Sequence, residues 1–279
     1  MPNNYNATSS SVIHGLWIGN KMSALELLTI HSFLQHGFQF HLWTYQQIEN
    51  IPNGCTVRDA NEIIPKQAVF FYSNKNKFGH GKGSYAGFSD IFRYKLLYEY
   101  GGIWTDMDVT CIQNININTE YFFRYHHKSG AVGNFMKCPP KSELMQWCYQ
   151  QASKNINENN TNWMLPIEIL NDGIKRYQLE NYIQAISNID SFPIVLSLLK
   201  NKSSIPKEWK LIHWMNEEFR NLNIDKNDCL EGSFLAFQYK KYQLPHQTIK
   251  GKNKITYLLR LNRLYYLLKN IKATLNWYL

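Results

Sequence analysis

A predicted helix, a Gly-Gly turn and a short apolar strand follow one another between residues 89 and 109, and this stretch constrains the fold most. The strand ends at Asp106 and Asp108, two carboxylates separated by one residue. On a strand, side chains two residues apart lie on the same face, so both carboxylates can address one ligand. Carboxylate oxygens are preferred ligands of hard divalent cations. The pattern predicts a cation site at a strand end, with two solvated aspartates as the structural alternative.

The helix before this strand carries a second pair of charges. Ser89 is a suitable N-cap, residues 90–100 form the expected helix, and Gly101 is the expected glycine after its last turn. Asp90 and Arg93 are three residues apart and therefore share a helix face. Such a pair is either a surface ion pair of little energetic value or a guanidinium fork for phosphate and sugar hydroxyls, with Asp90 accepting a hydroxyl.

The order of predicted elements favours an α/β fold. With 279 residues the chain is long enough for one sizeable core. An apolar strand at 12–19, a helix at 23–35 and an alternating strand at 39–43 form a βαβ unit, which predicts a parallel sheet. A further strand is expected at 192–198. Ligands of open α/β sheets bind at the carboxyl ends of the strands, where Asp106 and Asp108 are expected.

A glycine-rich basic loop is expected at residues 74–87, which contain four glycines together with Lys75, Lys77, His80 and Lys82. It either covers a diphosphate or serves as a plain connector.

The net charge of +9 predicts an anionic partner. The chain shows no nucleic-acid-binding motif, so nucleic acid is not the expected partner. From Lys250 onward the chain has seven basic residues and no acidic one. We therefore divide it into a flexible leader at 1–11, a domain at 12–250 and a basic, aromatic helical tail at 251–279. The tail either contacts an anionic membrane surface peripherally or packs on the domain.

The cysteines and the leader bear on the compartment. Five cysteines, an odd number, form no C-x-x-C pair, and residues 1–11 contain no apolar signal segment. We expect a reduced, cytoplasmic protein, peripheral on the inner face of the cytoplasmic membrane if the tail binds lipid.

A histidine from a distant segment is a candidate for the cation site. His213 precedes Trp214, Met215 and Asn216. A neutral imidazole can complete a carboxylate site as a third ligand, although a lone histidine beside a tryptophan is also typical of a core position.

Taken together, these motifs resemble the family 32 glycosyltransferases, retaining enzymes of the bacterial capsule and lipopolysaccharide type with a DxD motif. They are also similar to the catalytic domains of clostridial glucosylating toxins. The similarity extends to about residue 245. It covers the segments His14–Gly19, Asp90–Arg93, Asp106–Asp108, Asn134–Met145 and His213–Glu217. In the last segment Asn216 stands one place later than in the family pattern, and residues 161–170 lack the Gly-Pro usual before the acceptor helix.

The resemblance implies a GT-A-like single domain with a Rossmann-like, mostly parallel sheet. It implies a hexosyltransferase that uses Mn²⁺ or Mg²⁺ and moves a sugar, with retention, from a nucleotide-diphosphate donor, expected to be a UDP-sugar. The implied acceptor is an oligosaccharide or lipid-linked glycan in surface polysaccharide or lipopolysaccharide biosynthesis. The implied catalytic residues are Asp90, Arg93, Asp106 and Asp108. The implied metal ligands are Asp106, Asp108 and His213. Trp17 would stack on the base of the donor, and the further donor contacts are Ile18, Gly19, Asn134 and Asn216.

Three alternatives remain open. Residues 106–110 also fit the DxDxT signature of haloacid-dehalogenase-like phosphatases, in which the first aspartate is a nucleophile. The same transfer chemistry could modify host proteins, as the toxins do. A carbohydrate-binding protein on an inactive transferase fold is the third.

Overall fold

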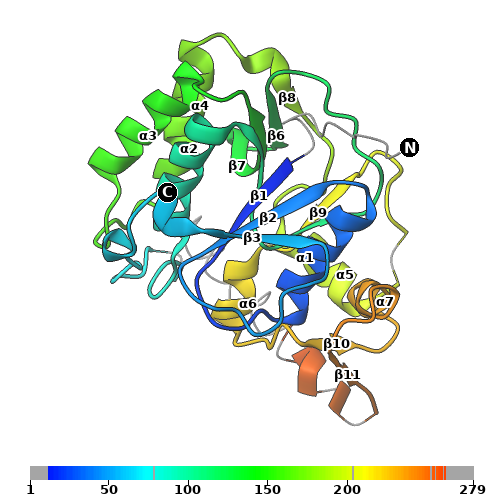
Figure 1. Cartoon of the computed structure of the whole chain (residues 1–279). Helices are drawn as coiled ribbons and strands as arrows, with labels where there is room; N and C mark the ends of the chain where they lie inside the picture. Colours follow the sequence, from blue (N-terminus) through cyan, green and yellow to red (C-terminus); the bar gives the residue numbers. More distant parts are fainter. Residues whose placement is uncertain are drawn as a thin grey trace, which may run out of the picture.

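A computed structural model describes residues 12–261 except residues 78, 203, 252, 255 and 260. A central sheet of seven strands, in the order β3-β2-β1-β4-β7-β6-β8, organises this part of the chain (Figure 1). Its strands are β1 (Val12–Trp17), β2 (Gln39–Thr44), β3 (Cys55–Asp59), β4 (Gly102–Thr105), β6 (Phe122–His126), β7 (Gly130–Cys138) and β8 (Ile183–Gln184). Two small sheets pair β5 (Val109–Cys111) with β9 (Leu211–His213), and β10 (Asp228–Leu230) with β11 (Gln247–Ile249).

Seven α-helices and three short 3-10 helices have both ends within the described residues, and residues 253–254, 256–259 and 261 are also helical. The α-helices are α1 (Ala24–Gln35), α2 (Ala86–Tyr100), α3 (Glu143–Asn155), α4 (Leu165–Arg176), α5 (Phe192–Lys200), α6 (Asn216–Leu222) and α7 (Phe234–Lys241). The 3-10 helices are η2 (Ala60–Glu62), η3 (Lys66–Ala68) and η4 (Glu180–Tyr182).

Most strand pairs of the central sheet are parallel. β1 pairs in parallel with β2 and β4, β2 with β3, and β6 with β8, whereas β7 is antiparallel to both β4 and β6. The predicted βαβ unit is therefore confirmed as β1-α1-β2, and so is the α/β class with a mostly parallel sheet. This arrangement is consistent with the GT-A-like fold that the resemblance implies.

The start of α1 follows from local chemistry. The Ser23 side chain accepts a hydrogen bond from the amide of Leu25 at 3.3 Å, and the Glu26 carboxylate accepts one from the amide of Ser23 at 2.8 Å. This capping box satisfies amides that a helix start otherwise leaves unpaired. The helix consequently begins within one residue of the predicted position.

The sheet is covered by helices on both faces, as Figure 1 shows, with α2, α3 and α4 on one face and α1, α5 and α7 on the other. Consecutive strand residues point to opposite faces, so each strand contributes to both cores. Phe122 packs in the core beneath α1, and Phe123 packs in the core beneath α2 and α3. Ile103 and Trp104 divide between the two cores in the same way. This two-sided burial explains the near-continuous apolar runs of the strands.

The helix α2 begins at Ala86, four residues before the predicted start at Asp90. The predicted N-cap Ser89 is wrong: the N-cap is Tyr85, whose side chain makes no capping bond, and the amide of Ala86 donates to the Ser84 hydroxyl at 3.2 Å. Its end is as predicted, at Gly101, whose φ of 65° is favourable for glycine.

The strand predicted at 192–198 is wrong, because these residues form α5. Phe192, Val195, Leu196 and Leu199 are buried, and their spacing follows the helical period rather than the alternation of a strand. Pro193 lies in the first turn, where a proline is tolerated because that turn needs no amide donor.

The ends of the chain lie largely outside the description. The predicted leader at 1–11 and residues 262–279 of the predicted tail are not among the described residues. Tyr257 and Leu261, at the start of the predicted tail, are buried in the domain core. In the part of the chain that is described, no helix combines the length and apolar character needed to cross a membrane.

His14 at the centre of β1 predicts a pH dependence of stability. The side chain is 3% exposed, and its Nδ1 accepts a hydrogen bond from Trp43 Nε1 at 3.1 Å. Burial, with smaller effects of His41 and Arg58, lowers the pKa of His14 to about 3. Between about pH 6.5 and pH 3 the unfolded chain therefore binds a proton that the folded chain does not bind. The free energy of unfolding consequently decreases as the pH is lowered through this window.

We expect this histidine to cost the folded state about 2–3 kcal/mol on acidification from pH 7.5 to pH 4.5. Denaturant unfolding at both pH values should therefore show a smaller loss for His14→Asn than for the wild type. Equal losses in the two proteins would contradict the assignment.

Candidate functional site

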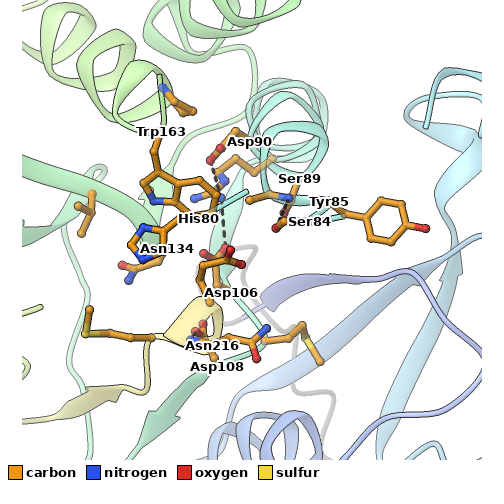
Figure 2. A pocket seen from close by; sticks show the side chains of 18 of the residues that line it. His80, Ser84, Tyr85, Ser89, Asp90, Asp106, Asp108, Asn134, Trp163 and Asn216 are labelled. Carbon is orange, nitrogen blue, oxygen red and sulfur yellow. Dashed lines mark hydrogen bonds and ion pairs between the residues drawn. The ribbon is translucent and has the colours of Figure 1, made fainter. Parts of the chain in front are cut away.

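A cavity of about 590 Å³ opens where β1 and β4 end at the carboxyl edge of the sheet (Figure 2). Nine of the predicted site residues line it: Trp17, Ile18, Asp90, Arg93, Asp106, Asp108, Asn134, His213 and Asn216. The tenth, Gly19, lies against the ring of Trp17 with a φ of 152°, and a Cβ there would be 3.2 Å from the indole Nε1. The structure therefore gathers five separate sequence segments around one cavity.

The two carboxylates of the DxD motif occupy the turn between β4 and β5 rather than a strand. The amide of Asp106 donates to the carbonyl of Asn134 at 2.8 Å, and the carbonyl of Asp108 accepts from the amide of Trp214 at 2.9 Å. The strand-alternation argument is wrong in detail. Both side chains still reach the cavity because these backbone bonds anchor the turn on either side.

Arg93 is buried at the cavity wall and is not a surface residue. Its Nη2 lies 2.6 Å from Asp90 Oδ1 and 3.3 Å from Asp106 Oδ1, and its guanidinium lies 5.4 Å from the ring centroid of Trp104. The side chain is only 6% exposed. The predicted shared face of Asp90 and Arg93 is confirmed, and α2 directs both into the cavity (Figure 2).

A glycine on β7 makes room for this arginine. A Cβ on Gly133 would lie 2.5 Å from Arg93 Nη1, closer than atoms can approach. Any other residue at this position would displace the guanidinium from Asp90 and Asp106. The neighbouring strand therefore shares in placing the α2 side chain.

The carboxylates of the cavity wall do not titrate alike. Burial raises the pKa of Asp90 to about 7, Arg93 opposes this shift, and Asp106 adds to it. Burial also raises the pKa of Asp106 against the opposing effect of Arg93. For Asp108, burial is outweighed by His213 and by the amide of Asn216, which lower its pKa. Near neutral pH Asp90 is therefore present in both forms and can donate or accept a hydrogen bond.

Trp17, at the end of β1, lines the cavity, and its indole has a hydrogen-bond donor that is not used within the described part of the chain. Its Nε1 is buried and has no hydrogen-bond partner among the described residues. The ammonium of Lys226 lies 5.5 Å from the indole centroid and pairs with the buried Glu26 of α1. This arrangement leaves a flat aromatic ring with a donor and a nearby positive charge at one end of the cavity.

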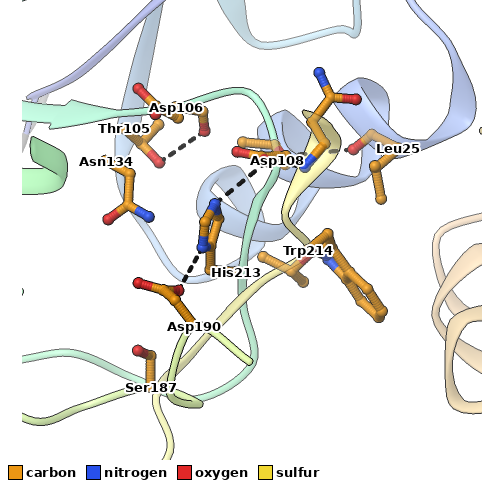
Figure 3. Close-up of polar contacts among 12 residues, drawn as sticks. Leu25, Thr105, Asp106, Asp108, Asn134, Ser187, Asp190, His213 and Trp214 are labelled. Atoms are coloured by element: carbon orange, nitrogen blue, oxygen red, sulfur yellow. Dashed lines mark hydrogen bonds and ion pairs between the residues drawn. The ribbon is translucent and has the colours of Figure 1, made fainter. Parts of the chain in front are cut away.

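His213 lies between two carboxylates (Figure 3). Its Nδ1 is 2.6 Å from Asp190 Oδ1, and its Nε2 is 3.4 Å from Asp108 Oδ2. Burial alone would lower the pKa of His213, but Asp108 and Asp190 outweigh it and raise the pKa to about 10. The two carboxylates thus favour the protonated imidazole, and His213 lies where it can hold Asp108 in place.

Asp190 is in turn fixed by a buried arginine on β6. Arg124 has no exposed surface and binds both carboxylate oxygens of Asp190, at 2.7 and 2.9 Å. The same guanidinium donates to Ser187 Oγ at 2.6 Å and to Asn134 Oδ1 at 3.2 Å. Burial would raise the pKa of Asp190, but His213 and Arg124 hold it well below its usual range. Arg124 therefore connects Asn134 on one side of the cavity to His213 on the other.

Sequence reasoning missed both Arg124 and Asp190. The only sequence signal for Arg124 is a single charge inside the aromatic run of residues 121–125, which is unusual for a buried strand. Asp190 lies in an irregular segment before α5 with no motif around it. His126, also left without a role, lines the cavity with its Nε2 3.6 Å from Asp190.

Residues 29–123 match the family model described as a glycosyltransferase sugar-binding region containing a DXD motif. The matched range includes Asp90, Arg93, Asp106 and Asp108, all at the cavity wall. This part of the chain is similar to the DXD sugar-binding region of glycosyltransferases. The similarity supports the prediction of a DxD glycosyltransferase at this level.

One viral relative and two solved structures are similar to this chain at low identity. An uncharacterized glycosyltransferase of Acanthamoeba polyphaga mimivirus is 23% identical over 192 residues, which are 65% of this chain and 70% of the relative. The solved PaToxG glycosyltransferase is 12% identical with a TM-score of 0.43, covering 92% of this chain and 84% of its own. A mutant transferase structure is 9% identical with a TM-score of 0.42, covering 62% of this chain and 86% of its own.

The oxygen atoms that line this cavity fit a hard divalent cation. Asn216 Oδ1 is buried beside the cavity without a hydrogen-bond partner among the described residues. The amide of Asn216 binds Asp108 Oδ2 at 2.7 Å, which keeps the two residues together. Amide and carboxylate oxygens suit Mn²⁺ and Mg²⁺. Within the described residues, no three His, Cys, Asp or Glu side chains form a ready metal cluster. The ligand role of His213 stays a prediction.

Replacing Asp190 with asparagine should destabilise the fold, because Arg124 and His213 would lose the carboxylate that they share. We expect the free energy of unfolding to fall by about 3–5 kcal/mol, as when one member of a buried ion pair is removed. Urea unfolding measures this loss.

The exposed Asp172 on α4 gives a matched control. Asp172→Asn should change the free energy of unfolding by no more than about 0.5 kcal/mol. If Asp190→Asn were as stable as this control, the buried connection would not have the structural role described.

Proposed function

We propose that the chain transfers a sugar from a UDP-sugar to an acceptor hydroxyl, with a divalent cation and with retention of anomeric configuration. The observation that carries the proposal is the meeting of the DxD carboxylates, the buried Arg93 and the Trp17 ring in one cavity. A carboxylate pair suits a cation, a buried guanidinium suits phosphate or sugar oxygens, and an aromatic ring suits a base. The base, the diphosphate and the sugar are the three parts of a nucleotide-sugar, and the cation would accompany the diphosphate.

Mn²⁺ or Mg²⁺ would be held by Asp106 and Asp108, with the unpartnered Asn216 Oδ1 as a further oxygen ligand. Bound there, the cation would supply Lewis-acid neutralisation of the leaving diphosphate. His213 and the Asn216 amide orient Asp108 through their bonds to its carboxylate. Arg93 and the indole of Trp104 orient Asp106 at 3.3 and 2.7 Å.

The donor would lie along the cavity with its base on Trp17 and its sugar near Asp90 and Asn134. Asp90, with its raised pKa, can accept or donate a hydrogen bond to a sugar hydroxyl. Arg124 fixes the Asn134 side chain. Both oxygens of Asp190 bind Arg124, so Asp190 is held away from the role of a nucleophile. We therefore favour attack by the acceptor on the same face that the diphosphate leaves.

The acceptor and the cellular setting follow from the resemblance to family 32. We propose a glycan or lipid-linked saccharide acceptor in surface polysaccharide or lipopolysaccharide biosynthesis, at the cytoplasmic face of the membrane. The basic tail beyond Lys250 would provide the peripheral contact with anionic lipid. A host-protein acceptor remains the alternative with the same chemistry.

The phosphatase alternative is weaker. Asp106 would be its nucleophile, yet Asp106 Oδ1 is already bound by Arg93 and by Trp104 Nε1. The family match of residues 29–123 is to a sugar-binding region. Hydrolysis of a generic phosphomonoester would favour the phosphatase instead.

A panel of UDP- and GDP-sugars, incubated with the purified protein in Mn²⁺ or in EDTA, tests the proposal through release of free nucleotide diphosphate. We expect release of UDP from one sugar in Mn²⁺ and none in EDTA. No release, together with no thermal stabilisation by UDP and Mn²⁺, would contradict it.

In that assay Asp108→Asn should lower metal-dependent kcat/KM by about a hundredfold or more, because one cation ligand is lost. Asp172→Asn should match the wild type, and circular dichroism checks that both variants are folded. Activity of Asp108→Asn within about tenfold of the wild type would overturn the site assignment.

A further inference from the structure

The cavity has a wall that the donor residues do not account for. Tyr72 just before the glycine-rich loop and His80 within it also line the cavity, as do Trp163 and Met164 just before α4 and Ile167 in its first turn. None of these residues belongs to a predicted donor motif. In Figure 2, Trp163 and His80 lie beside each other, and both line the same cavity as Asp106 and Asn134. This wall therefore adjoins the place where the donor sugar is proposed to lie.

The wall is a built surface rather than a loose group of side chains. The Trp163 ring lies 5.7 Å from the ring of His80 and 6.1 Å from that of Tyr72, centroid to centroid. The Tyr72 hydroxyl accepts a hydrogen bond from Asn160 Nδ2 at 3.4 Å. The amide of Ser73 donates to the carbonyl of Glu158 at 2.7 Å, which joins the two segments.

The glycine-rich loop is also fastened to α6. His80 Nε2 is 3.1 Å from Glu218 Oε1, the amide of Gly81 donates to Glu217 Oε1 at 2.8 Å, and Arg220 donates to the carbonyl of Lys82 at 2.8 Å. The imidazole of His80 is thereby oriented on one side by a carboxylate and packed on the other side by Trp163. The residue before this helix, Met215, has a left-handed backbone with a φ of 59°. The loop therefore holds its place beside the cavity through side chains of a second element.

We propose that Trp163 and His80, backed by the buried Tyr72, form an acceptor subsite for a pyranose ring. The carbon–hydrogen face of a pyranose is apolar and flat, and its edge carries hydroxyls. A half-buried indole suits that face, and the imidazole suits the edge. Met164 and Ile167 extend the apolar side. That the bound saccharide is an acceptor rests on the proposed transferase function, whereas the binding of a saccharide at this wall does not.

The position of the subsite supports this choice of ligand. An acceptor must bring a hydroxyl to the donor sugar, which is proposed to lie near Asp90 and Asn134, and Trp163 lines the same cavity as both. A concave wall with aromatic and apolar side chains and few polar groups is typical of small-ligand sites. A saccharide acceptor therefore fits this wall better than an extended protein surface does.

Saturation-transfer NMR with methyl α- and β-glucosides, the matching galactosides and lactose tests the inference on the full chain in UDP and Mn²⁺. We expect at least one of these saccharides to bind the wild type. Trp163→Ala should weaken that binding about tenfold, the value of one aromatic contact, and Trp163→Phe should retain most of it. Phe237→Ala removes an exposed aromatic ring outside the cavity and should leave binding unchanged.

Calorimetric titration with UDP and Mn²⁺ on the same variants separates the subsite from the donor site. UDP affinity should stay within twofold in Trp163→Ala. If Trp163→Ala lost both UDP binding and saccharide binding, Trp163 would belong to the donor site and the inference would be overturned. It would also be overturned if no saccharide bound the wild type, or if Trp163→Ala bound it as tightly. Saccharide binding at Trp163 without any UDP binding would instead refute the proposed transferase and leave the saccharide site standing.

Discussion

The bond between Arg124 and Asp190 is the interaction on which the geometry of the cavity depends. Arg124 is fully buried in β6, and a buried guanidinium is costly unless its charge is matched and its donors are used. Asp190 supplies the charge, while Ser187, Asn134 and the carbonyl of Asn188 accept further bonds. Asp190 also contacts His213, and His213 in turn contacts Asp108 (Figure 3).

This connection joins elements that the sheet alone does not hold together. β6 belongs to the central sheet, His213 ends β9 of a small sheet, and Asp190 lies in the segment before α5. The topology places Trp17 and the DxD turn at one edge, because β1 and β4 are adjacent and parallel. The buried charges then set the orientation of Asp108 and Asn134 within that edge. Backbone topology and side-chain electrostatics therefore contribute to the site at different scales.

The parts of the structure that local sequence determines were predictable. The Ser23 cap, the Gly101 helix end, the β1-α1-β2 unit and the shared face of Asp90 and Arg93 each follow from a few neighbouring residues. The parts that depend on distant partners were not. An apolar run such as 192–198 fits a strand or a helix until its packing is known, and the pairing of Arg124 with Asp190 joins residues 66 positions apart. The Trp163 ring packs against Tyr72 and His80, and no local sequence pattern connects these two residues to it.

The most direct test of the account is a crystal structure of the chain with UDP and Mn²⁺, with the metal located by anomalous scattering. The account predicts one manganese peak beside Asp106 and Asp108, within reach of Asn216 Oδ1, and the uracil ring on Trp17. A manganese peak away from the DxD turn, or a nucleotide bound elsewhere on the chain, would contradict it.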